Sequence, residues 1–176
     1  MVRLNDILKN IATEKITGER EVMISDICFD SRRAGPGSAF VAVKGTTSDG
    51  HDFISMAIEK GAVVIICQDA PKMMLPNITY VQVNDAASAL GIVASNFYGN
   101  PSQSLKLVGV TGTNGKTTTA TLLYRLFKAL GYKAGLLSTV INYVNDTAVE
   151  ATHTTPDPVQ LNQLLSRCLL YTSRCV

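Results

Sequence analysis

The sequence predicts an α/β fold in two units, and three observations lead to that prediction. Apolar segments of strand length, of which residues 62–67 are the most continuous, alternate with segments whose apolar residues recur at helical spacing. A polar stretch at 99–104, rich in Gly, Ser, Asn and Pro, separates two such patterns. Beyond it, a strand-like segment runs through a glycine-rich loop directly into a helical segment, an order typical of a βαβ unit with parallel strands.

The first predicted unit covers residues 1–100. A short helix is expected where Leu4, Ile7, Leu8 and Ile11 are spaced on one face. Strands are expected at 22–29, 39–43, 62–67 and 78–83, and helices at 52–60 and 85–98. Gly61 is the expected C-cap of the first of these helices, and Asn84 or Asp85 is the expected N-cap of the second.

The second predicted unit, residues 101–176, begins with a strand at 105–111. A helix follows to about Leu130, with a buried stripe formed by Leu122, Leu123, Leu126, Phe127 and Leu130. A strand at 134–138, a turn at Asn145–Asp146 between two short strands, and a helix opened by Pro158 complete it. A domain with so few strands cannot cover both faces of its parallel sheet, and we therefore expect this domain to be truncated. Residues 168–176 are either a non-native tail or an ordinary helix end.

Composition limits the classes of function. A hydrophobic content of 46% and a charged content of 17% indicate a globular protein, and a net charge of +2 argues against a nucleic-acid partner. No apolar run is long enough to span a membrane, and residues 1–9 lack a signal-peptide core, so we expect a cytoplasmic protein with no membrane partner. The four cysteines form no CxxC pair, which favours buried or unpaired thiols over zinc ligands or a disulfide.

The glycine-rich loop at 109–118 is the most informative motif. Gly112 and Gly115 permit a tight turn that aims backbone N–H groups at an anion, and the following helix adds its N-terminus. Lys116 can reach the β- and γ-phosphates of a nucleotide, and the Thr117 hydroxyl can hold Mg²⁺. The Walker A pattern places its first Gly at the position of Val110, so the loop is a variant. The alternative is a glycine-rich turn with a surface lysine, but the strand–loop–helix context favours a nucleoside-triphosphate site.

Three further polar clusters follow predicted strands or precede predicted helices: Asp30-Ser31-Arg32, Thr46-Thr47-Ser48-Asp49-Gly50-His51 and His153-Thr154-Thr155-Pro156-Asp157-Pro158. Hydroxyl and N–H groups on the first two loops suit a uridine ring and a diphosphate. Taken singly, the first two clusters favour a capping role, with Asp30 capping a turn and Asp49 or Ser48 capping a helix. The alternative for the third is a simple N-cap before Pro158. No carboxylate pair or nucleophile–base pair can be identified.

Together these motifs resemble the Mur ligases of peptidoglycan synthesis, and their MurE branch in particular. The resemblance covers about residues 4–167. It is carried by Phe29-Asp30-Ser31-Arg32, residues 36–42, Gly45, Asp49-Gly50-His51-Asp52-Phe53, Phe97-Tyr98-Gly99-Asn100-Pro101-Ser102, Val110-Thr111-Gly112-Thr113-Asn114-Gly115-Lys116-Thr117-Thr118 and Thr154-Thr155-Pro156-Asp157. MurF-type loops usually have Ser at the position of Thr113, so the MurE branch is preferred.

The resemblance implies a three-domain ATP-dependent ligase with Mg²⁺, acting as a monomer. By position, Ser31, Thr46, Thr47 and Ser48 would contact the UDP end of the substrate. Gly112, Thr113, Asn114, Gly115, Lys116, Thr117 and Thr118 would hold ATP, with Lys116 catalytic and Thr117 at the metal. His153, Thr154 and Thr155 would contact UDP-MurNAc-dipeptide, although many relatives have Asn at the position of His153.

The implied reaction joins a diamino acid, meso-diaminopimelate or L-lysine, to UDP-MurNAc-L-Ala-D-Glu through an acyl phosphate. The family's later catalytic residues and amino-acid-selecting domain are absent from these 176 residues, so we expect an N-terminal fragment that is inactive by itself. Two alternatives stay open: a MurF-type ligase that adds D-Ala-D-Ala, and a non-enzymatic nucleotide-binding module. Folylpolyglutamate synthetases share the loop but lack the Asp-Ser-Arg domain, which disfavours them.

Overall fold

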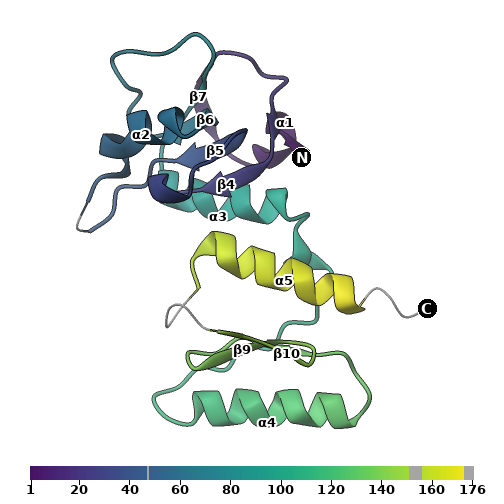
Figure 1. Ribbon diagram of the computed structural model, residues 1–176. Coiled ribbons are helices and arrows are strands. Elements are labelled where there is room, and N and C mark those ends of the chain that lie inside the picture. The colour runs from purple at the N-terminus through teal and green to yellow at the C-terminus, as the bar shows by residue number, and fades with distance from the viewer. Residues whose placement is uncertain (47, 151–155, 173–176) are drawn as a thin grey trace. The chain divides into compact units, whose positions relative to one another are not determined.

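The computed structural model describes residues 1–46, 48–150 and 156–172 (Figure 1). Within it the chain forms two compact units, Met1–Phe97 and Tyr98–Val176. The described residues of the first unit form two sheets and those of the second form one, and each unit is described by itself below.

The first unit is built on a five-stranded sheet of order β2-β7-β6-β5-β4. Its strands are β2 (Thr13–Thr17), β4 (Asp26–Cys28), β5 (Ser38–Val41), β6 (Ala62–Cys67) and β7 (Thr79–Val83). The four strands β4 to β7 pair in parallel, whereas β2 lies antiparallel to β7 at the edge. A separate two-stranded pair joins β1 (Val2–Arg3) to β3 (Met23–Ile24). The predicted strand at 22–29 is therefore divided between two sheets at Ser25.

Short helices connect the strands and cover the sheet. They are α1 (Leu4–Ile7), the 3-10 helices η1 (Ser31–Arg33) and η2 (Gly50–Phe53), α2 (Ile54–Glu59) and α3 (Ala86–Phe97). Figure 1 shows α2 and α3 on different sides of the sheet, and α1 packs against α3. Both faces of the parallel strands are thus covered, as such strands require.

The core follows from the alternation of side chains along the strands. Phe40, Ile65 and Tyr80 point to the face covered by α2, where they meet Ile54 and Ala57. The intervening strand residues point the other way, and the apolar side chains of α3 are buried with them. β6 is apolar on both faces and is the central strand of the sheet, between β7 and β5.

Local sequence signals fix the helix boundaries. Asp85, one of the two predicted N-caps, begins α3, since its carboxylate accepts hydrogen bonds from the N–H groups of Ala87 (2.9 Å) and Ser88 (3.0 Å). Gly61 follows α2 with φ +104°, and a Cβ there would lie 2.8 Å from the Cα of Pro36. A side chain at Gly61 would therefore be excluded by both backbone conformation and space.

The second unit contains two long helices and a small sheet. The elements are η3 (Pro101–Gln103), α4 (Lys116–Ala129), β8 (Gly135–Leu136), β9 (Ile141–Val144), β10 (Thr147–Glu150) and α5 (Pro158–Thr172). Figure 1 shows the sheet between α4 and α5. The predicted turn at Asn145–Asp146 joins β9 to β10, with Asn145 at φ 54°, and Pro158 opens α5 as expected.

Three expectations for this unit are wrong. Residues 105–111 form no strand, and the sheet β10-β9-β8 is antiparallel throughout rather than parallel. The predicted stripe of α4 is also not buried, since Leu122, Leu126 and Leu130 are 59%, 53% and 62% exposed. The reason is shared: a parallel strand needs neighbours from distant parts of a chain, and no described segment supplies them or covers this helix face.

Candidate functional site

Two predicted substrate loops lie at the same edge of the first sheet. Ser31 follows the carboxyl end of β4, and Thr46 and Ser48 follow the carboxyl end of β5. Because β4 and β5 are parallel neighbours, their following loops emerge on one side. In open α/β sheets this edge is where ligands bind. Thr47, the third predicted loop residue, lies outside the described residues.

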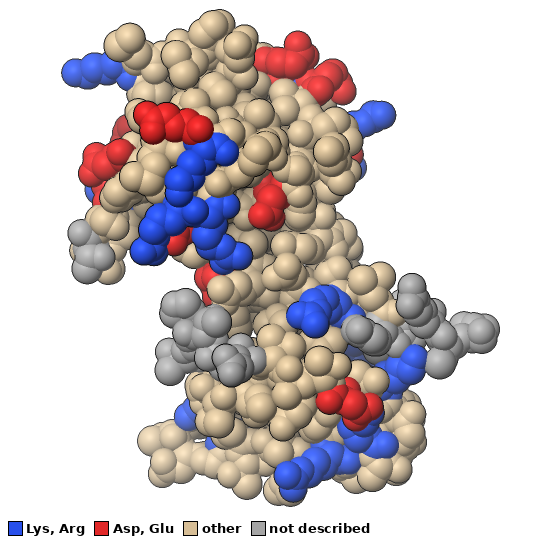
Figure 2. Space-filling view, viewed as in Figure 1, with Lys and Arg blue, Asp and Glu red and all other residues tan. Residues whose placement is uncertain are grey.

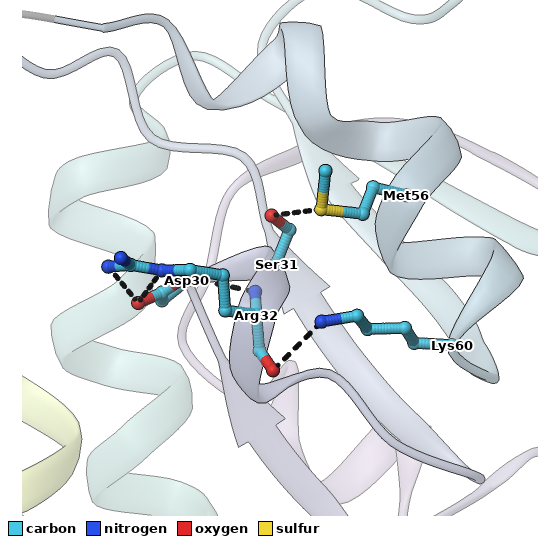
Figure 3. Close-up of polar contacts among 5 residues, drawn as sticks. All are labelled: Asp30, Ser31, Arg32, Met56 and Lys60. Carbon is cyan, nitrogen blue, oxygen red and sulfur yellow. Dashed lines mark hydrogen bonds and ion pairs between the residues drawn. The ribbon is translucent and has the colours of Figure 1, made fainter.

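The Asp30-Ser31-Arg32 cluster is tightly bonded within itself (Figure 3). The Arg32 guanidinium donates to Asp30 through Nε (2.9 Å to Oδ1) and Nη2 (2.8 Å to Oδ2), and the Arg32 N–H donates to Asp30 Oδ1 (2.9 Å). The Ser31 hydroxyl donates to Met56 Sδ (3.3 Å), and Lys60 Nζ donates to the Arg32 carbonyl (3.0 Å). The cluster is thereby joined to α2.

These contacts define what each residue of the cluster offers a ligand. Asp30 caps η1, which confirms the interpretation of that residue as a cap. Hydrogen bonds from the Arg32 side chain lower the pKa of the Asp30 carboxyl group. Ser31 is 6% exposed and its hydroxyl proton is donated to Met56, so it can donate to a ligand only by leaving Met56. The Arg32 side chain is 82% exposed. It therefore carries the accessible positive charge of the cluster.

The loop after β5 is closed by backbone contacts. The Gly50 N–H donates to the Val43 carbonyl (2.9 Å), and the Gly45 N–H donates to the Ser48 carbonyl (3.0 Å). A Cβ at Gly50 would lie 2.7 Å from both the N and the O of Val43. Only glycine fits there, because atoms of fixed backbone occupy the space that a side chain needs.

His51 holds this loop in place through both ring nitrogens. Nδ1 lies 2.6 Å from Asp49 Oδ1, and Nε2 accepts from the N–H groups of Gln68 (3.1 Å) and Asp69 (3.3 Å), just beyond β6. Asp49 also caps η2 by accepting from the His51 N–H (3.0 Å), which confirms its capping interpretation. Hydrogen bonds from His51, first from its backbone and then from its ring, lower the pKa of Asp49. The sequence shows His51 only as part of a motif, because its partners beyond β6, Gln68 and Asp69, are 17 and 18 residues away.

The predicted phosphate loop leads into α4. Gly112 and Gly115 have φ values of +148° and +78°, the left-handed region that favours glycine. Lys116 bends back over the loop, and its Nζ donates to the carbonyls of Gly112 and Thr113. The ammonium thus lies across the loop that the sequence assigns to phosphate.

The residues around this loop suit a nucleoside triphosphate. Gly115 is the N-cap of α4 and offers no side-chain cap, so the first-turn N–H groups suit an anion. Thr113, Asn114, Thr117 and Thr118 are all exposed beside it. A hydroxyl at Thr117, one residue into the helix, is suited to a phosphate-bound Mg²⁺.

The third predicted cluster is only partly described. His153, Thr154 and Thr155 lie outside the described residues. Asp157 begins α5, accepting from the Gln160 N–H at its carboxylate (2.9 Å) and from the Leu161 N–H at its carbonyl (2.8 Å). The N-cap is therefore the residue immediately before Pro158.

Charge and hydropathy of the described residues add little to these sites. Among them, no three His, Cys, Asp or Glu side chains gather as metal ligands, and no helix has the length and apolar character to cross a membrane. On the face shown in Figure 2, basic side chains of the first unit lie beside acidic ones.

Two family models match the chain. Residues 23–98 match the Mur ligase family catalytic domain, and residues 110–174 match the Mur ligase middle domain. The matches cover most of both units.

Curated relatives share about half of the sequence. UDP-N-acetylmuramoyl-L-alanyl-D-glutamate–2,6-diaminopimelate ligases from Cytophaga hutchinsonii and Bacteroides fragilis are 53% and 51% identical over 94% of this chain. The chain covers 34% of each, so it spans about a third of the length of these relatives.

Solved structures agree on the fold. A structure of a ligase with the same name matches with a TM-score of 0.73 and 20% identity, covering 97% of this chain and 34% of that one. MurF ligase from Thermotoga maritima in complex with ADP matches with a TM-score of 0.53 and 27% identity, covering 80% of this chain and 28% of that one.

Proposed function

Because the chain belongs to the Mur ligase family, we propose that it supplies the UDP-substrate-binding and ATP-binding parts of a MurE-type ligase. In this proposal residues 1–100 form the domain for the UDP end of the substrate, and residues 101–176 begin the ATP-binding domain. The protein would work in the cytoplasm as a monomer.

The proposed reaction forms an amide in two steps. A carboxylate oxygen of the D-Glu in UDP-MurNAc-L-Ala-D-Glu bonds to the γ-phosphorus of ATP while the bond to the ADP oxygen breaks. The amine nitrogen of meso-diaminopimelate or L-lysine then bonds to the carbonyl carbon, inorganic phosphate leaves, and the amine gives up its proton. Phosphorylation is needed because a carboxylate is otherwise a poor electrophile.

Each proposed residue has a defined role. Lys116 would exchange its two loop carbonyls for phosphate oxygens and offset the negative charge of the transferring phosphoryl group. Gly112 to Gly115 and the start of α4 would donate backbone N–H groups, with Thr118 beside them. Thr117 would hold Mg²⁺, which would offset the negative charge of the phosphates. Ser31, Thr46, Thr47 and Ser48 would contact the UDP end, and His153, Thr154 and Thr155 the dipeptide end.

One observation carries the nucleotide part of the proposal: a glycine-rich loop enters α4 with Lys116 over its carbonyls and with no side-chain cap at Gly115. Titration of the 176-residue chain with MgATP should therefore show binding that Lys116→Ala weakens by more than tenfold, about 1.4 kcal/mol or more. Lys106→Ala changes an exposed lysine outside the loop and should bind as the unmodified chain does. Equal affinities for both variants would contradict the phosphate-loop assignment.

A second titration tests the substrate. UDP-MurNAc-L-Ala-D-Glu and UDP alone should both bind, and the tripeptide form should bind more weakly. Tighter binding of the tripeptide form would favour a MurF-type ligase. MgATP binding without any affinity for UDP-sugars would favour a nucleotide-binding module with no ligase role.

A further inference from the structure

Among the described residues, the His51 side chain joins the loop that carries Thr46 and Ser48 to the end of β6. On the loop side, His51 Nδ1 contacts Asp49 Oδ1 at 2.6 Å. On the sheet side, Nε2 receives the Gln68 and Asp69 N–H groups at 3.1 and 3.3 Å. Backbone N–H groups can only donate, so Nε2 accepts and the proton of the neutral ring is on Nδ1.

We infer that His51 is a positioning residue for substrate binding, and that it holds the loop only while its ring is neutral. This inference rests on the proposed function, because the loop matters only if it contacts the UDP end of a substrate. Its basis is the geometry of the two ring nitrogens. Neither nitrogen faces bulk solvent freely, since the His51 side chain is only 15% exposed.

Protonation would affect the two sides of the ring oppositely. At Nδ1 the contact with Asp49 would become a charge-assisted hydrogen bond and would persist. At Nε2 a new N–H would face two backbone N–H donors, and none of the three would have an acceptor there. The His51–Asp49 pair would therefore stay together and separate from the end of β6, and the loop would move with it.

The other charged groups near the ring do not reverse this outcome. Lys44 Nζ lies 4.0 Å from Asp49 Oδ2 and offsets part of the negative charge of that carboxylate. Asp69 contributes its N–H to Nε2, and Asp52 lies next to His51 on η2. Their carboxylates can stabilise the positive charge of an imidazolium, but neither supplies an acceptor at Nε2 in this arrangement.

The consequence is a pH dependence of substrate affinity. The diphosphate and carboxylates of UDP-MurNAc-L-Ala-D-Glu keep their charge between pH 8 and pH 5.5, so a change in affinity over this range reports on the protein. We expect the affinity of the 176-residue chain for this ligand to fall by about five- to tenfold between pH 8 and pH 5.5, as Nε2 loses its two donors.

His51→Gln is the informative variant. A glutamine oxygen can accept from the same backbone N–H groups but does not titrate, so this variant should bind at pH 8 within about threefold of the unmodified chain and lose most of the pH dependence. His51→Ala should bind weakly at both pH values. His153 is unchanged in both variants, so any pH dependence that it contributes remains and can be subtracted.

Calorimetric titrations at pH 8 and 5.5 separate the outcomes, with circular dichroism confirming that each variant is folded. Binding that falls with pH in the unmodified chain but not in His51→Gln supports the inference. Binding that is equal at both pH values, or that falls equally in His51→Gln, overturns it and leaves the proposed function intact. No binding at either pH overturns the proposed function, and the role of His51 with it. In the chain without ligand, the NMR resonances of the Gln68 and Asp69 amides should move between pH 8 and 5.5, because these amides donate to His51 Nε2. Resonances that do not move also overturn the inference.

Discussion

Replacing Gly50 with alanine should destabilise the first unit, because the new methyl group has no room. Its carbon would lie 2.7 Å from the N and O of Val43 and 3.1 Å from the carbonyl carbon of Ala42. Ordinary contacts begin near 3.4 Å, so the backbone must shift by about 0.7 Å. That shift would disturb the hydrogen bond from the Gly50 N–H to the Val43 carbonyl, now 2.9 Å long.

The magnitude follows from three contributions. Overpacking costs about 1–3 kcal/mol, and weakening the hydrogen bond costs about 1 kcal/mol. Loss of unfolded-state freedom on changing glycine to alanine offsets about 0.4–1 kcal/mol. We therefore expect Gly50→Ala to lower the free energy of unfolding by about 2 kcal/mol.

Urea unfolding followed by circular dichroism gives this free energy, and amide exchange in β5 and β6 assigns it to the first unit. Gly35→Ala is the matched control, since its methyl group would meet nothing within 4 Å. That variant should be as stable as the unmodified chain or slightly more stable. If both variants unfold at the same urea concentration, the steric argument for Gly50 is refuted.

Three further outcomes are expected. Hydrogen bonds from Ser88, first from its side chain and then from its backbone N–H, lower the pKa of Asp85. The ionised Asp85 cap therefore adds stability above the ordinary carboxyl pKa of about 3.9, and that stability is lost as pH falls through the lower pKa of the folded state. The stability of Asp85→Asn should therefore depend less on pH during acid unfolding than that of the unmodified chain. An unchanged pH dependence would contradict the capping role. Burial raises the pKa of the Cys28 and Cys67 thiols to about 11. At pH 8, iodoacetamide should therefore modify them at least about a hundredfold more slowly in the folded chain than in the chain unfolded in urea, as measured by mass spectrometry. Equal rates would contradict their burial. Tyr124→Phe removes a hydrogen bond to the β9–β10 turn and should destabilise the second unit by about 1 kcal/mol in urea unfolding, whereas Tyr132→Phe at an exposed position should not.

Elements with strong local signals were predictable from the sequence. The strand β6 is a continuous apolar run that begins directly after Gly61, and α3 begins at a capping aspartate and ends near the predicted residue. Both depend on residues within a few positions of each other. In the same way, the glycine-rich loop predicted a helix directly after it, and α4 begins at Lys116.

Features that depend on distant partners were not predictable. The edge strand β2 is mostly polar and exposed, and only its pairing with β7 makes it a strand. Residues 105–111 have strand-like composition but no strand neighbour in the described structure. The attachment of His51 to Gln68 likewise depends on the chain returning through β6, which no local pattern reveals.

The exposed apolar side chains of α4 have a consequence for how this chain behaves in solution. Leu122, Leu126 and Leu130 are each more than half exposed, and a net charge of +2 provides little electrostatic repulsion between molecules. Association through such surfaces increases with protein concentration. Added salt favours it further, because salt screens the weak electrostatic repulsion between molecules. The 176-residue chain should therefore show a negative second virial coefficient, and its solubility should fall with salt.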